Sequence, residues 1–267
     1  MPSLPLFPTR SPVRMPGLSL IVITKNEAPR IARCLSSVPF ASQVVVVDSG
    51  STDGTPDIAR ALGATVVVTP DWPGFGPQKN RALDLATQPW VLSLDADEYL
   101  SPQLQADIEA VLHAPQFEVY DFPRLSSYCG QFMRHSGWYP DPVTRLFRRG
   151  AARFTEDLIH ERLEARAPVG RLQGVLMHES FTSMEDVLAK VNSYSTAGAQ
   201  KLARAGKRMR LRQAVLKGLW AFFRSYVLRR GFLDGRRGFL LAVSNAEGTY
   251  YRCVKLWLMG QAEKTLR

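Results

Sequence analysis

The stretch Val91-Leu-Ser-Leu-Asp-Ala-Asp-Glu-Tyr99 joins the end of an apolar run to three acids within four positions. An apolar run of this length predicts a short buried strand, and the acids after it predict a polar loop. Side chains two positions apart on a strand point the same way, so Asp95 and Asp97 are expected to converge just beyond the carboxyl end of the strand. That edge is where ligands bind in open α/β sheets.

Two converging carboxylates suit a hard divalent cation such as Mg²⁺ or Mn²⁺, which prefers oxygen ligands and keeps positions open for phosphate oxygens. The alternative for an isolated Asp-x-Asp is a solvated acidic turn. The motif also resembles that of phosphatases with an aspartate nucleophile, but those have Thr or Val after it near the chain start. Here Glu98 follows, and the motif lies on the fourth predicted strand. The sequence upstream of this motif favours the cation site over a solvated acidic turn.

That upstream sequence alternates strand and helix patterns. Residues 18–24 (LSLIVIT) are rich in β-branched side chains, as is typical of a central parallel strand covered on both faces. Thr55 is the expected N-cap of a helix that has Pro56 at its first position. Further strands are predicted at residues 44–47 and 65–68, and helices at residues 29–38, 57–62 and 78–86. The alternation predicts the α/β class with a doubly wound, Rossmann-like sheet.

The remaining chain suggests three parts. Residues 1–16 hold five prolines and no apolar run, so they predict a frayed arm and no signal peptide. Residues 17–183 are expected to form the α/β domain, whose later part has short strand-like pieces rich in aromatic residues and arginine. From Met184 the pattern is helical, which predicts a helical extension over residues 184–267.

The charge of +10 is placed unevenly. Residues 201–267 hold 16 lysines and arginines against three acids, a net charge of +13, whereas the first 200 residues have a net charge of −3. Such asymmetry predicts an anionic partner, either a membrane surface or a nucleic acid. The three cysteines lack metal-site spacing and fit a reducing cytosol.

The helix predicted at residues 207–228 is amphipathic. One face is expected to carry Leu211, Val215, Leu219, Phe222 and Tyr226, and the opposite face Arg210, Lys217 and Arg224. Such a helix favours contact with anionic lipid, although a helix packed on the α/β domain would show the same apolar stripe. Because no apolar run reaches the roughly 18–20 residues needed to span a bilayer, we expect a protein that is soluble or rests on a membrane.

Several motifs resemble, in order and in strand–loop context, those of family 2 inverting glycosyltransferases with the GT-A fold. They are Thr24-Lys-Asn-Glu27, Val45-Val-Val-Asp48-Ser-Gly-Ser-Thr-Asp53-Gly-Thr55 and Leu94-Asp-Ala-Asp97. The chain also resembles the bacterial lipopolysaccharide-core β-1,4-glucosyltransferases of this family over roughly residues 18–180. That narrower resemblance rests on Gly74-Phe-Gly-Pro-Gln-Lys-Asn-Arg-Ala82, Gly137-Trp-Tyr-Pro-Asp141, Arg145-Leu-Phe147 and Leu158-Ile-His-Glu-Arg162.

The resemblance implies a donor site for a nucleotide sugar. Asp48 is expected to meet the uracil ring, its alternative being a capping acid in a turn. Asp53 lies in a turn that its own hydrogen bonds explain equally well. Lys79 and Arg81, predicted at the start of a helix, either counter the diphosphate or are plain surface bases. The full set of implied donor-binding residues is Thr24, Asn26, Glu27, Asp48, Asp53, Lys79, Arg81 and Asp95.

The resemblance also implies metal and acceptor residues. Asp97 is the expected direct ligand of Mg²⁺ or Mn²⁺, and Asp95 reaches the ribose or the water shell of the ion. His178 is a third candidate ligand or, alternatively, a hydrogen-bonded structural histidine. Acceptor binding is expected at Trp138, Tyr139, Asp141 and Arg145, and the alternative for the aromatic pair is a place in the core.

Inversion at the anomeric carbon requires a general base that takes the proton of the acceptor hydroxyl. The resemblance places Glu161 first, with Asp157 as the rival, whereas His160 and Glu161 could instead form a solvated helix face.

The predicted function is transfer of a hexose, glucose from UDP-glucose, to an inner-core sugar of lipopolysaccharide at the inner face of the cytoplasmic membrane. The alternatives are transfer to polyprenyl phosphate or another envelope glycan and, in a different class, nucleic-acid binding by the basic helices. Against nucleic acid, the bases share a helix with a wide apolar face and form no known reading motif.

Overall fold

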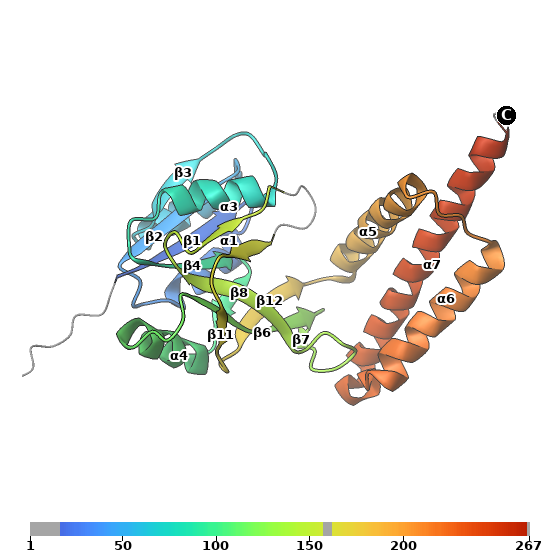
Figure 1. Ribbon diagram of the computed structural model, residues 1–267. Coiled ribbons are helices and arrows are strands. Elements are labelled where there is room, and N and C mark those ends of the chain that lie inside the picture. Colours follow the sequence, from blue (N-terminus) through green and yellow to red (C-terminus); the bar gives the residue numbers. More distant parts are fainter. Residues whose placement is uncertain (1–16, 157–161, 266–267) are drawn as a thin grey trace, which may run out of the picture. The chain divides into compact units, whose positions relative to one another are not determined.

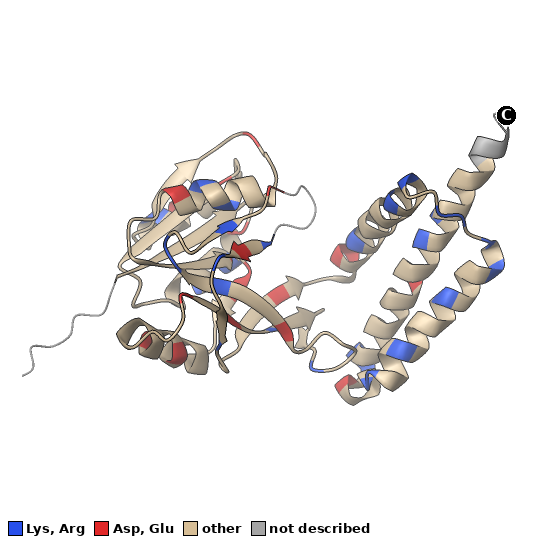
Figure 2. Cartoon of the chain, viewed as in Figure 1, with Lys and Arg blue, Asp and Glu red and all other residues tan. Residues whose placement is uncertain are grey.

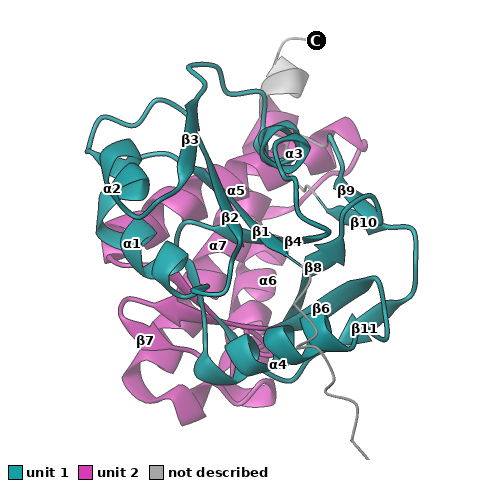
Figure 3. Ribbon diagram, turned by 90° about the vertical axis from the view of Figure 1, so that its left-hand side faces the viewer, with its two compact units in different colours: residues 1–122, 142–176 teal, residues 123–141, 177–267 magenta. Residues whose placement is uncertain are grey.

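The computed structural model describes residues 17–156 and 162–265. They fall into two compact units (Figure 3). The first unit is Met1–Phe122 with Pro142–Leu176, and the second is Pro123–Asp141 with Met177–Arg267. The predicted arm at residues 1–16 lies outside the described residues. Residues 123–141, which we expected in the α/β domain, group with the C-terminal helices.

The centre of the first unit is a parallel sheet with the strand order β3-β2-β1-β4 (Figure 1). These strands are β1 (Leu18–Thr24), β2 (Gln43–Asp48), β3 (Thr65–Val68) and β4 (Trp90–Asp95). All seven residues of β1 are buried, as a central strand covered on both faces requires. The four predicted strands are therefore confirmed, and so is their parallel arrangement.

The helices of this unit cover both faces of the sheet. The evidence is that alternate side chains of β1, which point to opposite faces, pack in two different apolar clusters. Leu20 and Val22 pack in a cluster with Ile31 of α1 and Leu104 of α4. Ile21 and Ile23 pack in the other cluster with side chains of α3. The helices are α1 (Ala28–Ser36), α2 (Thr55–Ala61), α3 (Phe75–Asp84) and α4 (Pro102–His113).

Two local predictions in these helices were wrong. Gly54, with φ of 84°, is the N-cap of α2, and Thr55 is the first helical residue. The helix α3 begins at Phe75 and not at Gln78, which places Arg81 in its last turn. The favourable positive end of the helix is therefore remote from Arg81.

After β4 the sheet becomes mixed, which differs from a purely parallel expectation. β8 (Asp141–Arg148) runs antiparallel to β4, with Leu92 opposite Leu146. The other strands of this region are β5 (Glu98–Leu100), β6 (Val119–Tyr128), β9 (Ala152–Phe154), β10 (Leu163–Ala165) and β11 (Val169–Arg171). Antiparallel β9 and β10 flank the undescribed residues 157–161.

The second unit is mainly helical. Its long helices are α5 (Met184–Arg204), α6 (Leu211–Phe223) and α7 (Gly235–Thr265), with a π-helical turn at Arg224–Leu228 and a 3₁₀ turn at Gly231–Asp234. Helix α5 begins at Met184 as predicted, capped reciprocally by Ser183 and Asp186. The short strands β7 (Gln131–Phe132) and β12 (Leu176–Phe181) precede the helices.

Helix α6 packs on α7 through small side chains. Ala214, Gly218 and Ala221 are its buried residues. A Cβ atom at Gly218 would lie 3.3 Å from Cβ of Tyr250, so glycine allows the two helices to approach closely. Across residues 17–156 and 162–265, no helix combines the length and apolar character needed to cross a membrane.

Candidate active site

Three of the predicted donor residues lie at one edge of the parallel sheet. Thr24 at the end of β1 pairs with Asp48 at the end of β2, and its neighbour Ile23 pairs with Asp95 at the end of β4. The parallel register therefore brings side chains from distant parts of the sequence to the carboxyl edge, where open α/β sheets bind ligands. The hydroxyl of Thr24 is buried there without a hydrogen-bond partner in the described chain, which leaves a polar atom for a ligand to satisfy.

Asn26 and Asp53 tie the loop after β1 to the loop after β2. The amide oxygen of Asn26, whose φ is 56°, accepts a hydrogen bond of 2.8 Å from the Thr52 amide. Asp53 accepts from the backbone N–H of Ala28 at 3.0 Å and of Thr55 at 3.1 Å. Hydrogen bonds, first that of the Thr55 hydroxyl and then that of the Ala28 N–H, lower the pKa of Asp53. Both side chains order the edge of the site, and their contact with a nucleoside stays a prediction.

Asp48 organises the turn that follows it. Its carboxylate is fully buried and accepts from the backbone N–H of Gly50 at 3.0 Å and of Ser51 at 2.8 Å. The Ser51 hydroxyl donates to the same carboxylate. This is the capping role that we gave as the alternative, and base binding by Asp48 stays a prediction.

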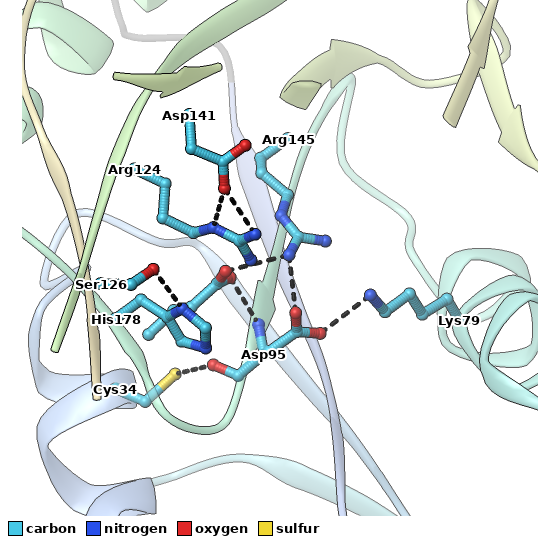
Figure 4. A network of polar contacts seen from close by, with 9 residues as sticks. Cys34, Lys79, Asp95, Arg124, Ser126, Asp141, Arg145 and His178 are labelled. Atoms are coloured by element: carbon cyan, nitrogen blue, oxygen red, sulfur yellow. Dashed lines mark hydrogen bonds and ion pairs between the residues drawn. The ribbon is translucent and has the colours of Figure 1, made fainter. Parts of the chain in front are cut away.

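Asp95 lies in a buried ion network, drawn in Figure 4. One carboxylate oxygen lies 2.8 Å from Nζ of Lys79, and the other lies 2.6 Å from a guanidinium nitrogen of Arg145. The same Arg145 nitrogen also lies 3.0 Å from Glu98, and the second Glu98 oxygen accepts from the Asp95 backbone N–H at 3.0 Å. The exposed fraction is 2% for Lys79, 8% for Arg145 and 0% for Glu98. Buried charges of this kind need close partners, and each of these has one.

This network changes the interpretation of two bases. Lys79 is not a plain surface base, because it is buried against Asp95. Burial by itself lowers the pKa of Arg145, but the charges of Asp95 and Glu98 outweigh it, so the pKa is raised. The structure thus places Arg145 among the acids at the sheet edge, and its contact with the acceptor stays a prediction. Arg81, by contrast, forms a forked pair with Asp71 at 2.6 and 2.9 Å on the surface.

Asp97 lies in the turn between β4 and β5, partly exposed. Burial is the largest cause that raises the pKa of Glu27, and the charge of Asp97 raises it further while Arg30 lowers it. Burial also raises the pKa of Cys34, with the charges of Glu98, Asp97 and Asp95 acting in the same direction. The charge of Asp97 therefore acts on side chains of α1 and of the loop that follows β1.

These residues fit a divalent cation of the Mg²⁺ type. Such an ion takes oxygen ligands and is usually bound by one or two carboxylates, with water and substrate phosphate completing its shell. Within the described residues no cluster of three or more His, Cys, Asp and Glu side chains is placed to hold a metal, so a full protein cage is not present there. Both oxygens of Asp95 face bases, and direct metal binding by Asp97 with Asp95 in support stays a prediction.

The predicted acceptor residues belong to the second unit, apart from Arg145. Trp138 and Asp141 line a cavity of about 610 Å³ in that unit. The Trp138 ring packs against Tyr128 and Phe181, with centroids 6.0 and 5.9 Å away. Asp141 accepts from Arg124 at 2.7 Å. These aromatic and charged walls suit a sugar. Trp138 also packs against an apolar cluster, which agrees in part with the alternative of a place in the core.

Two further candidates of this unit have local partners. Nδ1 of His178 lies 2.9 Å from the Ser126 hydroxyl, as Figure 4 shows, and this agrees with the structural alternative for this residue. Its role as a metal ligand stays a prediction. Tyr139 carries the guanidinium of Arg134 over its ring at 6.0 Å.

The general-base candidates Glu161 and Asp157, and also His160, lie outside the described residues. Their flanks are ordered by β9 and β10, where the backbone N–H of Thr155 donates to the Arg162 carbonyl at 2.9 Å.

Comparisons with known proteins point to one family. Residues 19–162 match the model of glycosyl transferase family 2. An uncharacterized glycosyltransferase of Rickettsia prowazekii is 33% identical over 255 residues, which cover 91% of this chain and 87% of that protein. The protein LpsC of Rhizobium meliloti, named a lipopolysaccharide core biosynthesis glycosyltransferase, is 29% identical over 90% of this chain and 92% of its own length. The crystal structure of Staphylococcus aureus TarS residues 1–349 aligns with a TM-score of 0.47 and 17% identity, over 94% of this chain and 92% of that one.

Proposed function

Since this chain belongs to glycosyl transferase family 2 and has the GT-A fold expected from its motifs, we propose that it moves a hexose, glucose from UDP-glucose, onto an inner-core sugar of lipopolysaccharide with inversion. The main support for the donor site is that Thr24, Asp48 and Asp95 lie together at one edge of the sheet. Asp97 lies in the turn that follows Asp95. The acceptor class is supported by the similarity to LpsC along nearly the whole chain.

Three residues at this sheet edge have a defined task in this proposal. Asp97 would hold Mg²⁺ or Mn²⁺ with support from Asp95, whose carboxylate is fixed by Lys79 and Arg145. The cation, when bound, offsets the negative charge that builds on the departing nucleoside diphosphate. The unpartnered hydroxyl of Thr24 is available to a polar group of the donor.

Transfer with inversion is one displacement at the anomeric carbon. Glu161 or Asp157 takes the proton of the acceptor hydroxyl as its oxygen attacks from the face opposite the diphosphate. The new carbon–oxygen bond forms as the bond to the diphosphate breaks, and the diphosphate leaves with the electron pair. The carboxylate that took the proton releases it to solvent after each turnover.

Calorimetric titration with UDP tests the donor site. The protein should bind UDP with Mn²⁺ present and much more weakly without it, and Asp97→Ala should remove the metal-dependent part. Asp57→Ala is a matched control, because that acid is 85% exposed and pairs with Arg60 on α2. Equal UDP binding with and without metal in wild-type protein would contradict the proposal.

We also propose that the second unit rests on an anionic membrane surface through the outer face of α6. The side chains of Leu216, Leu219 and Trp220 are 64%, 64% and 55% exposed, because the small residues of α6 face α7. Phe222 and Tyr226, predicted on this face, instead pack against Phe239 at 5.7 Å. The same helix carries the bases Arg212 and Lys217 and continues into Arg224 (Figure 2).

An exposed apolar face with bases beside it is typical of a helix that lies in the interface of an anionic bilayer. Co-sedimentation should show binding to vesicles that contain phosphatidylglycerol and weaker binding to pure phosphatidylcholine. Leu219→Gln with Trp220→Gln should reduce binding, whereas Leu62→Gln, at a side chain 46% exposed in the first unit, should not. Retention that vanishes at high salt, together with salt-sensitive binding to DNA, would favour a nucleic acid instead.

A further inference from the structure

The cavity of the second unit has walls suited to carbohydrate. Its volume is about 610 Å³, and all of its lining residues lie in Pro123–Asp141 or Met177–Arg267. Trp138 and Tyr194 offer aromatic faces, and Tyr194 is 65% exposed. Ser180, Asn245 and Thr249 add hydroxyl and amide groups. Flat rings beside short polar side chains match a sugar, which has an apolar face and a rim of hydroxyls.

The charges around this cavity do not balance. Three bases line it, namely Arg124, Lys190 and Arg252, whereas Asp141 is the one acid among the lining residues of the described chain. Arg124 is held by Asp141 at 2.7 Å, so that pair is neutral. Lys190 and Arg252 therefore give the cavity a positive potential.

Both remaining bases are positioned by the wall itself. Nζ of Lys190 on α5 lies 5.0 Å from the centroid of the Phe181 ring, which holds the ammonium group at an aromatic face. Arg252 on α7 passes Gly198 of α5, where a Cβ atom would come within 2.8 Å of the arginine Cδ. Glycine at that position leaves room for the arginine chain between the helices.

A nearby lysine on the same face of α7 shows what a structural base looks like in this unit. Lys255 donates to the Asn192 amide oxygen at 2.8 Å and to the hydroxyls of Ser195 at 2.8 Å and Thr196 at 2.7 Å. Its charge is therefore engaged in joining α7 to α5. Lys255 does not line the cavity, whereas Arg252, one helical turn earlier, does.

We infer that this cavity binds an anionic sugar of the acceptor, one that carries a carboxylate or a phosphate group, with Lys190 and Arg252 as the anion-binding side chains. The inference rests on the proposed function, since it places part of the glycolipid acceptor in the second unit. It adds the chemical class of the sugar and the residues that select it. A neutral sugar would leave both bases without the partner that their arrangement favours.

Titration calorimetry of the full chain with soluble sugars tests this inference. Glucuronic acid supplies a carboxylate, glucose 6-phosphate supplies a phosphate, and glucose is the neutral control. At least one anionic sugar should bind about tenfold or more tightly than glucose, since hydrogen bonds to charged groups contribute at that level. The tighter of the two anions identifies the acidic group.

Substitutions in α5 and α7 complete the test. Lys190→Gln and Arg252→Gln should each weaken binding of the anionic sugar by about tenfold. Lys201→Gln and Arg204→Gln, exposed bases on α5 outside the cavity, should bind it as wild type does. UDP binding with Mn²⁺ should be unchanged in all four variants, which also shows that they are folded.

Three results would overturn the inference. They are equal affinity for glucose and both anions, no effect of either cavity substitution, and inorganic phosphate binding as tightly as glucose 6-phosphate. The failure of the sugar titrations with intact UDP binding would refute the cavity assignment alone. Loss of metal-dependent UDP binding by wild-type protein would instead refute the proposed function.

Discussion

The sheet edge of the first unit and the cavity of the second unit treat charge in opposite ways. At the sheet edge, Lys79 and Arg145 are buried and paired with Asp95 and Glu98, so the protein itself neutralises these charges. In the cavity, Lys190 and Arg252 are exposed bases, and the one acid among the described wall residues pairs with another arginine. The first region thus uses charge to fix its own geometry, whereas the second leaves two bases for the anionic ligand that we infer.

The largest expected effect comes from removing the general base. This change should lower the rate of sugar transfer without affecting ligand binding in either region. Glu161→Gln should lower the rate of sugar transfer by about 10²–10⁴-fold, the range typical of a general base, while UDP binding stays intact. The measurement is turnover with UDP-glucose and a lipopolysaccharide acceptor, beside calorimetry with UDP. If Asp157→Asn shows this pattern and Glu161→Gln does not, then Asp157 is the base.

The closed network of the first unit predicts a large effect on stability. Arg145→Met should destabilise the fold by about 3–5 kcal/mol, because Glu98 would remain buried without its cation. Arg153→Met is the matched control, since Arg153 and Asp84 are 55% and 59% exposed in their pair and an exposed pair contributes about 0–1 kcal/mol. Urea denaturation measures both. Similar losses in the two variants would mean that the network is not the special feature of the first unit.

A smaller effect concerns pH. Hydrogen bonds from Thr55 and Ala28 lower the pKa of Asp53 below its value in the unfolded chain, about 3.9. A depressed pKa contributes stability above the unfolded value, and that stability is lost as the pH falls through the folded value. Wild-type protein should therefore lose more stability between about pH 5 and pH 2 than Asp53→Asn does. Thermal denaturation across this range tests the point, and parallel curves for the two proteins would contradict it.

The order of elements in the first unit followed from local pattern. Residues 18–24 were predicted to form a strand covered on both faces, because the run is rich in β-branched side chains and has no charge. The structure buries all seven. The acids after β4 likewise had to lie at its carboxyl end, since the register of a parallel sheet brings such ends together. Helix starts were less predictable. A glycine with positive φ caps α2, and α3 starts three residues before the predicted position, because helix boundaries depend on backbone conformation as well as on side-chain type.

The partners of the charged residues depended on tertiary structure. Arg145 lies 47 positions from Glu98 and 50 from Asp95, and no spacing rule connects such residues. The local signal for this network was weak. It was an acid, Glu98, at the first position of a short strand, where burial of the carboxylate requires a cation nearby. The same holds for the apolar face of α6. Its pattern showed that the helix was amphipathic, but the small residues Ala214 and Gly218 decided which side met α7.

Local sequence therefore determined which segments became strands and helices, because burial of apolar side chains has the period of each element. It also marked the acids at the strand ends. Only the folded chain decided which bases those acids hold, that Asn26 and Asp53 join two loops, and that α5 and α7 enclose a basic cavity. The physical reason is distance along the chain. Ion pairs and cavities form between residues that lie far apart in the sequence. They therefore exist only after the sheet and the helices have packed.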